Sequence, residues 1–162
     1  MQTTQYHLAQ INIARILAPL DDPIMAGFVT QLDAINAIAD ASPGFVWRLQ
    51  TDEGNATAIN VYEDNRILIN MSVWKTVEAL HQYTYRSAHN EVFKDRKKWF
   101  EPHSSHYMAL WWIPAGHIPS PEEGKEKLGL LSQNGPTPEV FTFKQQFPSP
   151  DTIEVIREGK KR

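Results

Sequence analysis

A stripe of polar and aromatic side chains on one expected helix is the clearest sign of chemistry in this sequence. Residues 77–100 show a helical pattern without proline, and Pro102 ends it. At about 100° per residue, one side of this helix collects imidazole, phenol, guanidinium and indole groups among smaller ones. These residues are His81, Tyr85, Ala88, His89, Val92, Arg96 and Trp99. A helix packed on a sheet usually presents Leu, Ile and Val to it, so the stripe indicates a wet or ligand-filled cavity.

These groups are suited to acid–base chemistry on an oxidisable substrate. His89 or His81 is the candidate base, and Arg86 or Arg96 is the candidate partner for a developing anion. Tyr85 is a further catalytic candidate beside His89, and an imidazole of this helix is also a candidate haem ligand. A structural alternative stays open. In it, His81 and Arg96 reach solvent, whereas Tyr85 and His89 satisfy hydrogen bonds in an ordinary core.

Other chemical motifs are weak or absent in the sequence. His103 and His106 form an H-x-x-H pair, but the spacing offers no suitable third ligand, so we expect no metal site. The chain has no cysteine, which excludes disulfides, thiolate zinc sites and iron–sulfur clusters. It also lacks a nucleotide-binding glycine loop, a G-x-S-x-G elbow and an H-E-x-x-H motif.

The elements that must position the stripe alternate between strands and helices. Apolar runs predict strands over 6–16, 45–50, 67–74 and 107–113. Between the first two strands, Asp22 and Pro23 begin a helix, and Pro43-Gly44 ends it. The order β, α, β, β, α, β predicts an α+β, ferredoxin-like fold, with an antiparallel sheet and both helices on one face.

Details within these elements give further expectations. Alternation in the second strand places Phe45, Trp47 and Leu49 on one face of the sheet. Ser120 and Pro121 begin an added C-terminal helix, and residues 141–143 add a short edge strand. We expect one domain over 1–147 and a polar C-terminal tail over 148–162.

The tryptophans bear on both the ligand and the assembly. Trp47, Trp74 and Trp99, together with His81, are expected to frame a bound ligand. With helices on one face only, the other sheet face would expose apolar and aromatic side chains, Trp111 or Trp112 among them. A second subunit would cover that face, so we expect a homodimer.

Composition limits the possible partners and the compartment. The 162 residues are 41% hydrophobic, 10% aromatic and 22% charged, which is typical of a folded globular domain. A net charge of −3 gives no footprint for nucleic acid. No apolar stretch approaches the roughly 20 residues of a membrane-spanning helix, and residues 1–6 do not resemble a secretory signal. We therefore expect a cytoplasmic protein without membrane insertion.

Several tryptophan-rich blocks resemble a bacterial family of uncharacterised proteins in the dimeric α/β-barrel superfamily. The blocks are SPGFVWRL at 42–49, SVW at 72–74, YRSAH at 85–89 with Arg96 and Trp99-Phe100, ALWWIPAGH at 109–117, GPT at 135–137 and FTF at 141–143. The resemblance spans about residues 5–147. That family is distantly similar to spheroidene monooxygenase-like enzymes, and its superfamily includes cofactor-free monooxygenases and haem proteins.

The resemblance implies a dimeric fold with a pocket for apolar or aromatic ligands between sheet and helices. It assigns no catalytic residue. The expected function is a small monooxygenase that acts on an aromatic or polyene metabolite, with either no cofactor or haem. The alternative is a dimeric module that binds a small ligand or haem without catalysis.

Overall fold

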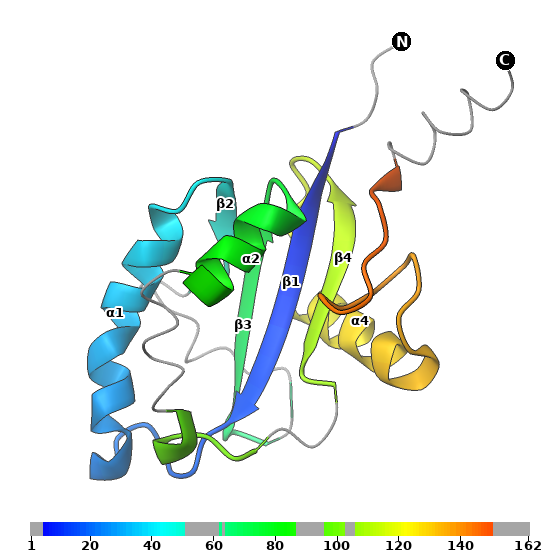
Figure 1. Cartoon of the computed structure of the whole chain (residues 1–162). Helices are drawn as coiled ribbons and strands as arrows, with labels where there is room; N and C mark the ends of the chain where they lie inside the picture. Colours follow the sequence, from blue (N-terminus) through cyan, green and yellow to red (C-terminus); the bar gives the residue numbers. More distant parts are fainter. Residues whose placement is uncertain (1–4, 51–61, 63, 87–95, 103–105, 151–162) are drawn as a thin grey trace, which may run out of the picture.

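A four-stranded antiparallel sheet in the order β2-β3-β1-β4 forms the centre of the molecule. The computed structural model describes residues 5–50, 62, 64–86, 96–102 and 106–150. The strands are β1 (Tyr6–Arg15), β2 (Phe45–Arg48), β3 (Ile67–Trp74) and β4 (Met108–Pro114). The helices are α1 (Ala26–Asp40), α2 (Val77–Arg86) and α4 (Pro121–Asn134). This order confirms the predicted ferredoxin-like α+β fold (Figure 1).

Local signals in the sequence explain where α1 begins and ends. The Asp22 side chain accepts a hydrogen bond from the Ile24 N–H at 3.0 Å, and Pro23 opens a short 3₁₀ turn, η1 (Pro23–Met25), that leads into α1. After α1, Gly44 has a φ of 82°, which favours glycine. The predicted boundaries of this helix are therefore confirmed.

Both α1 and α2 cover one face of the sheet, as predicted (Figure 1). This helix face carries the even-numbered residues of β1 and β3. At one end, α2 packs in a group that we call the α2 cluster. Its buried members are Leu8, Trp74, Val77, Leu80, Leu110 and Phe141. At the other end, η1 and α1 pack in the α1 cluster, whose buried members are Ile16, Met25 and Trp99.

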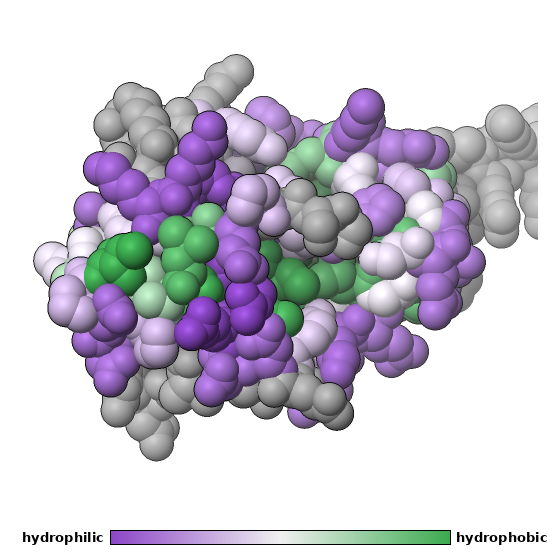
Figure 2. All heavy atoms as spheres, turned by 90° about the horizontal axis from the view of Figure 1, so that it is seen from below, coloured by the Kyte–Doolittle hydropathy of each residue, from purple (hydrophilic) through white to green (hydrophobic). Residues whose placement is uncertain are grey.

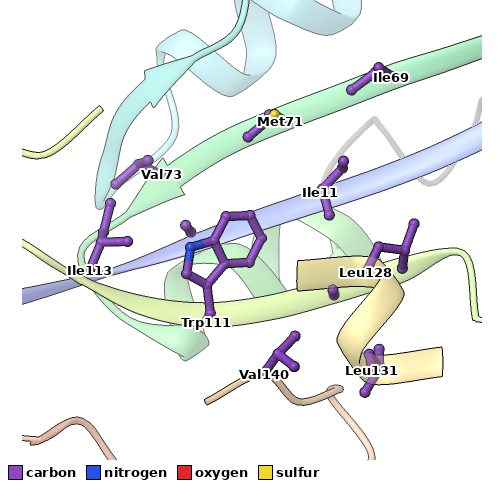
Figure 3. Close-up of a cluster of buried hydrophobic side chains, with 11 residues drawn as sticks. Ile11, Ile69, Met71, Val73, Trp111, Ile113, Leu128, Leu131 and Val140 are labelled. Carbon is purple, nitrogen blue, oxygen red and sulfur yellow. The ribbon is translucent and has the colours of Figure 1, made fainter. Parts of the chain in front are cut away.

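The opposite face of the sheet is covered by α4 of the same chain. Figure 3 shows Leu128 and Leu131 of α4 near Trp111 and Ile11. The buried members of this α4 cluster are Ala9, Ile11, Ile69, Met71, Val73, Ala109, Trp111, Ile113, Leu128, Leu131 and Val140. The predicted reason for a homodimer, an uncovered sheet face, was therefore wrong for the part of the sheet under α4. The helix expected as a mere addition supplies that cover.

The second strand contains an irregularity that the sequence pattern did not predict. Phe45 pairs with Trp74, whereas Trp47 pairs with Val73, so the register shifts between them. A β-bulge of this kind inserts one extra residue and reverses the alternation. Phe45 consequently packs against the α2 cluster and Trp47 against the α4 cluster. The prediction that they share a face was wrong.

The expected helix over 77–100 does not reach its predicted end. Helix α2 is described as far as Arg86, and residues 96–98 form a 3₁₀ turn, η2 (Arg96–Lys98). Phe100 then forms an isolated β-bridge with Ile16. Residues 87–95 lie outside the described part of the chain.

The segment after α4 runs along the outer edge of β4. Phe141 and Leu110 exchange two backbone hydrogen bonds at 2.8 and 2.9 Å, which places one bridge where a short edge strand was expected. The Trp112 indole Nε1–H donates to the Phe147 carbonyl at 2.9 Å. Since 151–162 are not described, the boundary between domain and tail stays a prediction.

Apolar side chains reach the surface where β1 ends and α1 begins. In the view from below, Figure 2 shows apolar surface between hydrophilic residues. Leu17, Ile24 and Val29 are exposed by 37%, 52% and 42%.

None of the described helices is long and apolar enough to cross a lipid bilayer.

Candidate functional site

Four polar side chains interrupt the helix face of the sheet between the two clusters. We call Gln10, Asn12, Asn70 and Ser72 the polar window. Gln10 and Asn12 belong to β1 and lie between Leu8 of the α2 cluster and Ile16 of the α1 cluster. Gln10 pairs with Ser72 and Asn12 pairs with Asn70 across β1 and β3. Amides at these positions of two central strands are costly unless they are hydrogen-bonded or serve a ligand.

Hydrogen bonds connect all four side chains of the window. The Gln10 Nε2 amine donates to Asn70 Oδ1 at 2.7 Å and to Ser72 Oγ at 2.8 Å. The Asn12 Nδ2 amine donates to Gln10 Oε1 at 3.0 Å and to Asn70 Oδ1 at 3.2 Å. A network of this kind fixes its side chains without any charged group.

The window is closed at one end and open at the other. Gln10 and Ser72 are 2% and 6% exposed, so their polar atoms are held away from solvent. Asn12 is half-buried and Asn70 is exposed. The asparagine end therefore remains accessible to a small molecule.

An aromatic pair adjoins the closed end. The Trp74 indole Nε1–H donates to Ser72 Oγ at 2.8 Å, and the Tyr83 ring stacks on Trp74 with centroids 5.1 Å apart. Burial raises the pKa of the Tyr83 phenol, so this group stays protonated at neutral pH. Trp74 and Tyr83 thus give the window an apolar end with a neutral phenol.

An ion pair lies beside this end. Arg48 is in register with Ser72, and its Nε donates to Asp40 Oδ1 of α1 at 2.8 Å. A second bond runs from Arg48 Nη2 to Asp40 Oδ2 at 3.3 Å. Such paired contacts fix the guanidinium and tie β2 to the end of α1.

The three tryptophans expected to frame a ligand are not brought together. Trp74 borders the polar window. Trp47 is half-buried on the opposite face of the sheet. Trp99 belongs to the α1 cluster, with its ring centroid 5.9 Å from that of Phe28. Of the three, only Trp74 borders the window, and any role of the others in binding stays a prediction.

The predicted helix stripe is also divided. His81 and Tyr85 lie side by side on α2, with centroids 4.6 Å apart, and both contact Phe143 of the C-terminal segment. Tyr85 is 50% exposed.

Arg96 begins η2, at the far end of the expected stripe. Arg86 ends α2, but its side chain lies outside the described part, as does the whole of His89. Their catalytic roles stay predictions.

The sequence contains a signal for the polar window in the alternation of two strands. In β1, Gln10 and Asn12 alternate with apolar residues, and in β3, Asn70 and Ser72 do the same. A sheet face that lies under helices is expected to be apolar. Polar side chains at paired positions of two strands on such a face indicate a site.

Few side chains in the described part of the chain could ligate a metal or haem iron. No group of three metal-ligating side chains occurs among the described residues. Three described imidazoles have partners or positions elsewhere: His7 pairs with Ile113 at the far end of β1, His81 contacts Phe143, and the His117 Nε2 lies 2.7 Å from Glu123. The fourth, His106, is exposed and lies two residues before Met108, which pairs with Asn12. His7, His81 and His117 therefore offer no haem ligand at the window.

Known proteins resemble this chain in fold at low identity, and no curated protein matches it. A Pseudomonas aeruginosa protein shares 13% identity over 72% of this chain and 100% of its own, with a TM-score of 0.45. A variant of SnoaB, a cofactor-independent oxygenase from Streptomyces nogalater, shares 11% over 69% and 95%, with a TM-score of 0.45. A Nitrosomonas europaea protein of unknown function shares 8% over 73% and 97%, also with a TM-score of 0.45.

One sequence family covers most of the chain. The model described as "Domain of unknown function (DUF3291)" matches residues 7–157. A match of this extent includes the sheet, all three described α-helices and the edge segment. The protein therefore belongs to the DUF3291 family.

Proposed function

We propose that the polar window binds an apolar or aromatic small molecule and that the protein oxygenates it as a cofactor-free monooxygenase. The observation that supports this proposal is the uncharged amide network between two helix-packed apolar clusters. Neutral amide donors can stabilise the oxygen of a substrate anion, and the apolar clusters on either side suit a carbon framework.

The reaction needs a substrate that forms an electron-rich anion. After loss of a proton, the carbanion carbon can react with O2; one oxygen atom becomes a carbonyl on that carbon and the other leaves as water. The two hydrogens of a CH2 group supply the hydrogens of that water, so the reaction balances without an added reductant. The four window residues contain no group that ionises near neutral pH, so the base must come from elsewhere.

His89 and His81 are the two predicted bases, and His89 lies outside the described residues. The His89→Ala variant is expected to abolish turnover with little change in Tm. His81→Ala is the matched comparison, because the ring of His81 packs on Tyr85 and Phe143, away from the window. A large drop in Tm without loss of activity would instead give His89 a structural role.

The alternative is a binding module without catalysis. The absence of a charged group among the four window residues favours it, since they can orient a ligand but cannot take a proton from it. Haem addition followed by an absorbance spectrum tests the haem version. We expect no Soret shift that depends on the window residues.

Oxygen uptake distinguishes the enzyme from the module. The probe is 1,8-dihydroxy-9-anthrone, whose CH2 group is readily deprotonated, with no cofactor added. Asn70→Leu should lower kcat/KM by about 100-fold, because an amide donor to the developing anion is lost. Asn134→Leu, the same change at the exposed end of α4, should leave it unchanged. Uptake no faster than the uncatalysed rate would contradict the oxygenase proposal.

A homodimer also stays a proposal. While α4 is docked, the sheet under it is not available to a second copy. An interface would have to use another surface, and sedimentation at micromolar concentration measures whether a dimer forms.

A further inference from the structure

We infer that the polar window is built to bind a neutral cis-amide, such as a lactam, through the Asn12–Asn70 pair. The inference rests on the proposed function only in placing the ligand at the window. It concerns which polar group of a ligand the pair prefers, whether or not the ligand is then oxygenated.

Hydrogen bonds within the window leave two groups of this pair unused. Asn12 commits its amine, which donates to Asn70 Oδ1 at 3.2 Å and to Gln10 Oε1 at 3.0 Å. Asn70 commits its carbonyl, which also accepts from Gln10 Nε2 at 2.7 Å. Among the described residues, no partner is found for the Asn12 carbonyl or the Asn70 amine.

This result does not depend on which way the side-chain amides are turned. A hydrogen bond between two primary amides uses the amine of one and the carbonyl of the other. The groups left over are then always one carbonyl and one amine. If Gln10 and both asparagines were reversed together, the asparagines would exchange roles and the pair would still offer one acceptor and one donor.

The two asparagines that carry the unused groups are neighbours at the open end of the window. Asn12 and Asn70 are direct partners across β1 and β3. Side chains at such positions lie about 5 Å apart at their Cβ atoms. Asn70 is exposed, so a ligand can reach it. A single small ligand can therefore contact both groups.

A lactam matches this arrangement better than other small polar groups. Its N–H and C=O lie on adjacent atoms and point the same way, so they cannot bond to each other. A hydroxyl next to a carbonyl closes an internal hydrogen bond and withdraws its donor. A carboxylate offers only acceptors, and the window has no cation among its four residues to balance its charge.

The test is calorimetric titration with three probes of one shape. 2-Quinolone presents a lactam edge, quinoline presents an acceptor alone, and naphthalene presents neither. The wild-type protein should bind 2-quinolone about tenfold more tightly than quinoline, which corresponds to the net gain of one to two hydrogen bonds. Naphthalene should bind no more tightly than quinoline.

Variants then assign the preference to the pair. Asn70→Asp keeps the shape but replaces the amine with an acceptor, and Asn12→Leu removes the second group. Both should reduce the preference for 2-quinolone over quinoline to less than about twofold. Asn134→Leu on α4 should keep it. Melting curves of each variant check that it is folded.

Two results would overturn the inference. One is equal affinity of the wild type for 2-quinolone and quinoline, including no binding of either. The other is a preference that survives in both folded asparagine variants. Oxygen uptake with the anthrone is measured separately. If the wild type prefers 2-quinolone and the asparagine variants lose this preference, but the wild type takes up no oxygen, only the oxygenase proposal is refuted. If the wild type takes up oxygen but does not prefer 2-quinolone, only this inference is refuted.

Discussion

Gly124 of α4 and Met71 of β3 lie so close that a Cβ atom at position 124 would be 3.0 Å from the Met71 sulfur. The same atom would be 2.8 Å from Ile11 Cδ1. Both neighbours are fully buried, so neither can move aside freely. The absence of a side chain at this one position lets α4 lie directly on the sheet.

Gly124→Ala should therefore destabilise the protein relative to Gly129→Ala. Position 129 is also helical but has open space around a built Cβ, so alanine there should raise the free energy of unfolding by up to about 1 kcal/mol. At position 124 the added methyl group overpacks the core, and the difference between the two variants should be about 1–3 kcal/mol. Urea unfolding measures both. Equal stabilisation would mean that α4 is not held as closely as described.

Glu123 should matter through the tryptophan that it satisfies. Its carboxylate accepts from the buried Trp111 Nε1–H at 3.0 Å and lies 2.7 Å from His117 Nε2. Glu123→Ala leaves the indole without its acceptor and should lower the free energy of unfolding by about 1–3 kcal/mol. Glu123→Gln keeps an acceptor oxygen and should lower it less. If the two variants are equally stable under chemical denaturation, the indole bond contributes nothing.

Acid should weaken the contact between β1 and the start of β3. The Arg15 guanidinium donates to Asp64 at 2.7 Å and, with the Arg66 backbone N–H, holds the pKa of Asp64 below its usual value. A lowered pKa in the folded state gives stability that is present above the unfolded value, about 4, and is lost as the pH falls through the folded value. Tm measured against pH should fall less steeply below about pH 4 for Asp64→Asn than for the wild type. Asp33→Asn on the exposed side of α1 is the control, and an unchanged slope for Asp64→Asn would refute the assignment.

Alkaline pH should act through Tyr83 in the opposite direction. Burial raises the pKa of this phenol, so the folded protein keeps a proton that the unfolded chain releases above about pH 10. Stability is then lost as the pH rises past the unfolded value. The decline of Tm between about pH 9 and 11 should be shallower in Tyr83→Phe. Identical slopes in wild type and variant would show that the phenol is not buried.

Much of the fold could be predicted because its signals are local. Asp22 and Pro23 mark the start of α1, and the apolar run of β3 has the predicted ends. The bulge between Phe45 and Trp47 could not be predicted, because alternation assumes regular pairing and pairing is decided by the neighbouring strand. A helical pattern likewise says where a helix is possible, but Arg96–Lys98 form a 3₁₀ turn and Phe100 forms a β-bridge with Ile16 instead of continuing an α-helix.

The candidate site was harder to predict than the fold. Ionisable and aromatic residues are the usual signals of chemistry in a sequence, and they pointed to His81 and Tyr85. In the structure, the rings of both residues contact Phe143. The window consists of amides and a hydroxyl, which have no distinctive motif and become a group only when β1 and β3 are paired. Trp74 was selected correctly as a neighbour of the site, but its hydrogen bond to Ser72 required the structure.

The most direct test of the account follows the side-chain amides of the window during ligand addition. In 15N–1H NMR spectra, the Asn12 and Asn70 side-chain NH2 signals are assigned from the Asn12→Leu and Asn70→Leu variants, and 2-quinolone is titrated into the wild type. The account predicts that the Asn70 signal moves most, the Asn12 signal moves with it, and the Asn134 signal of α4 stays still. Saturable binding that leaves both window signals unmoved would contradict the claim that ligands bind at the polar window.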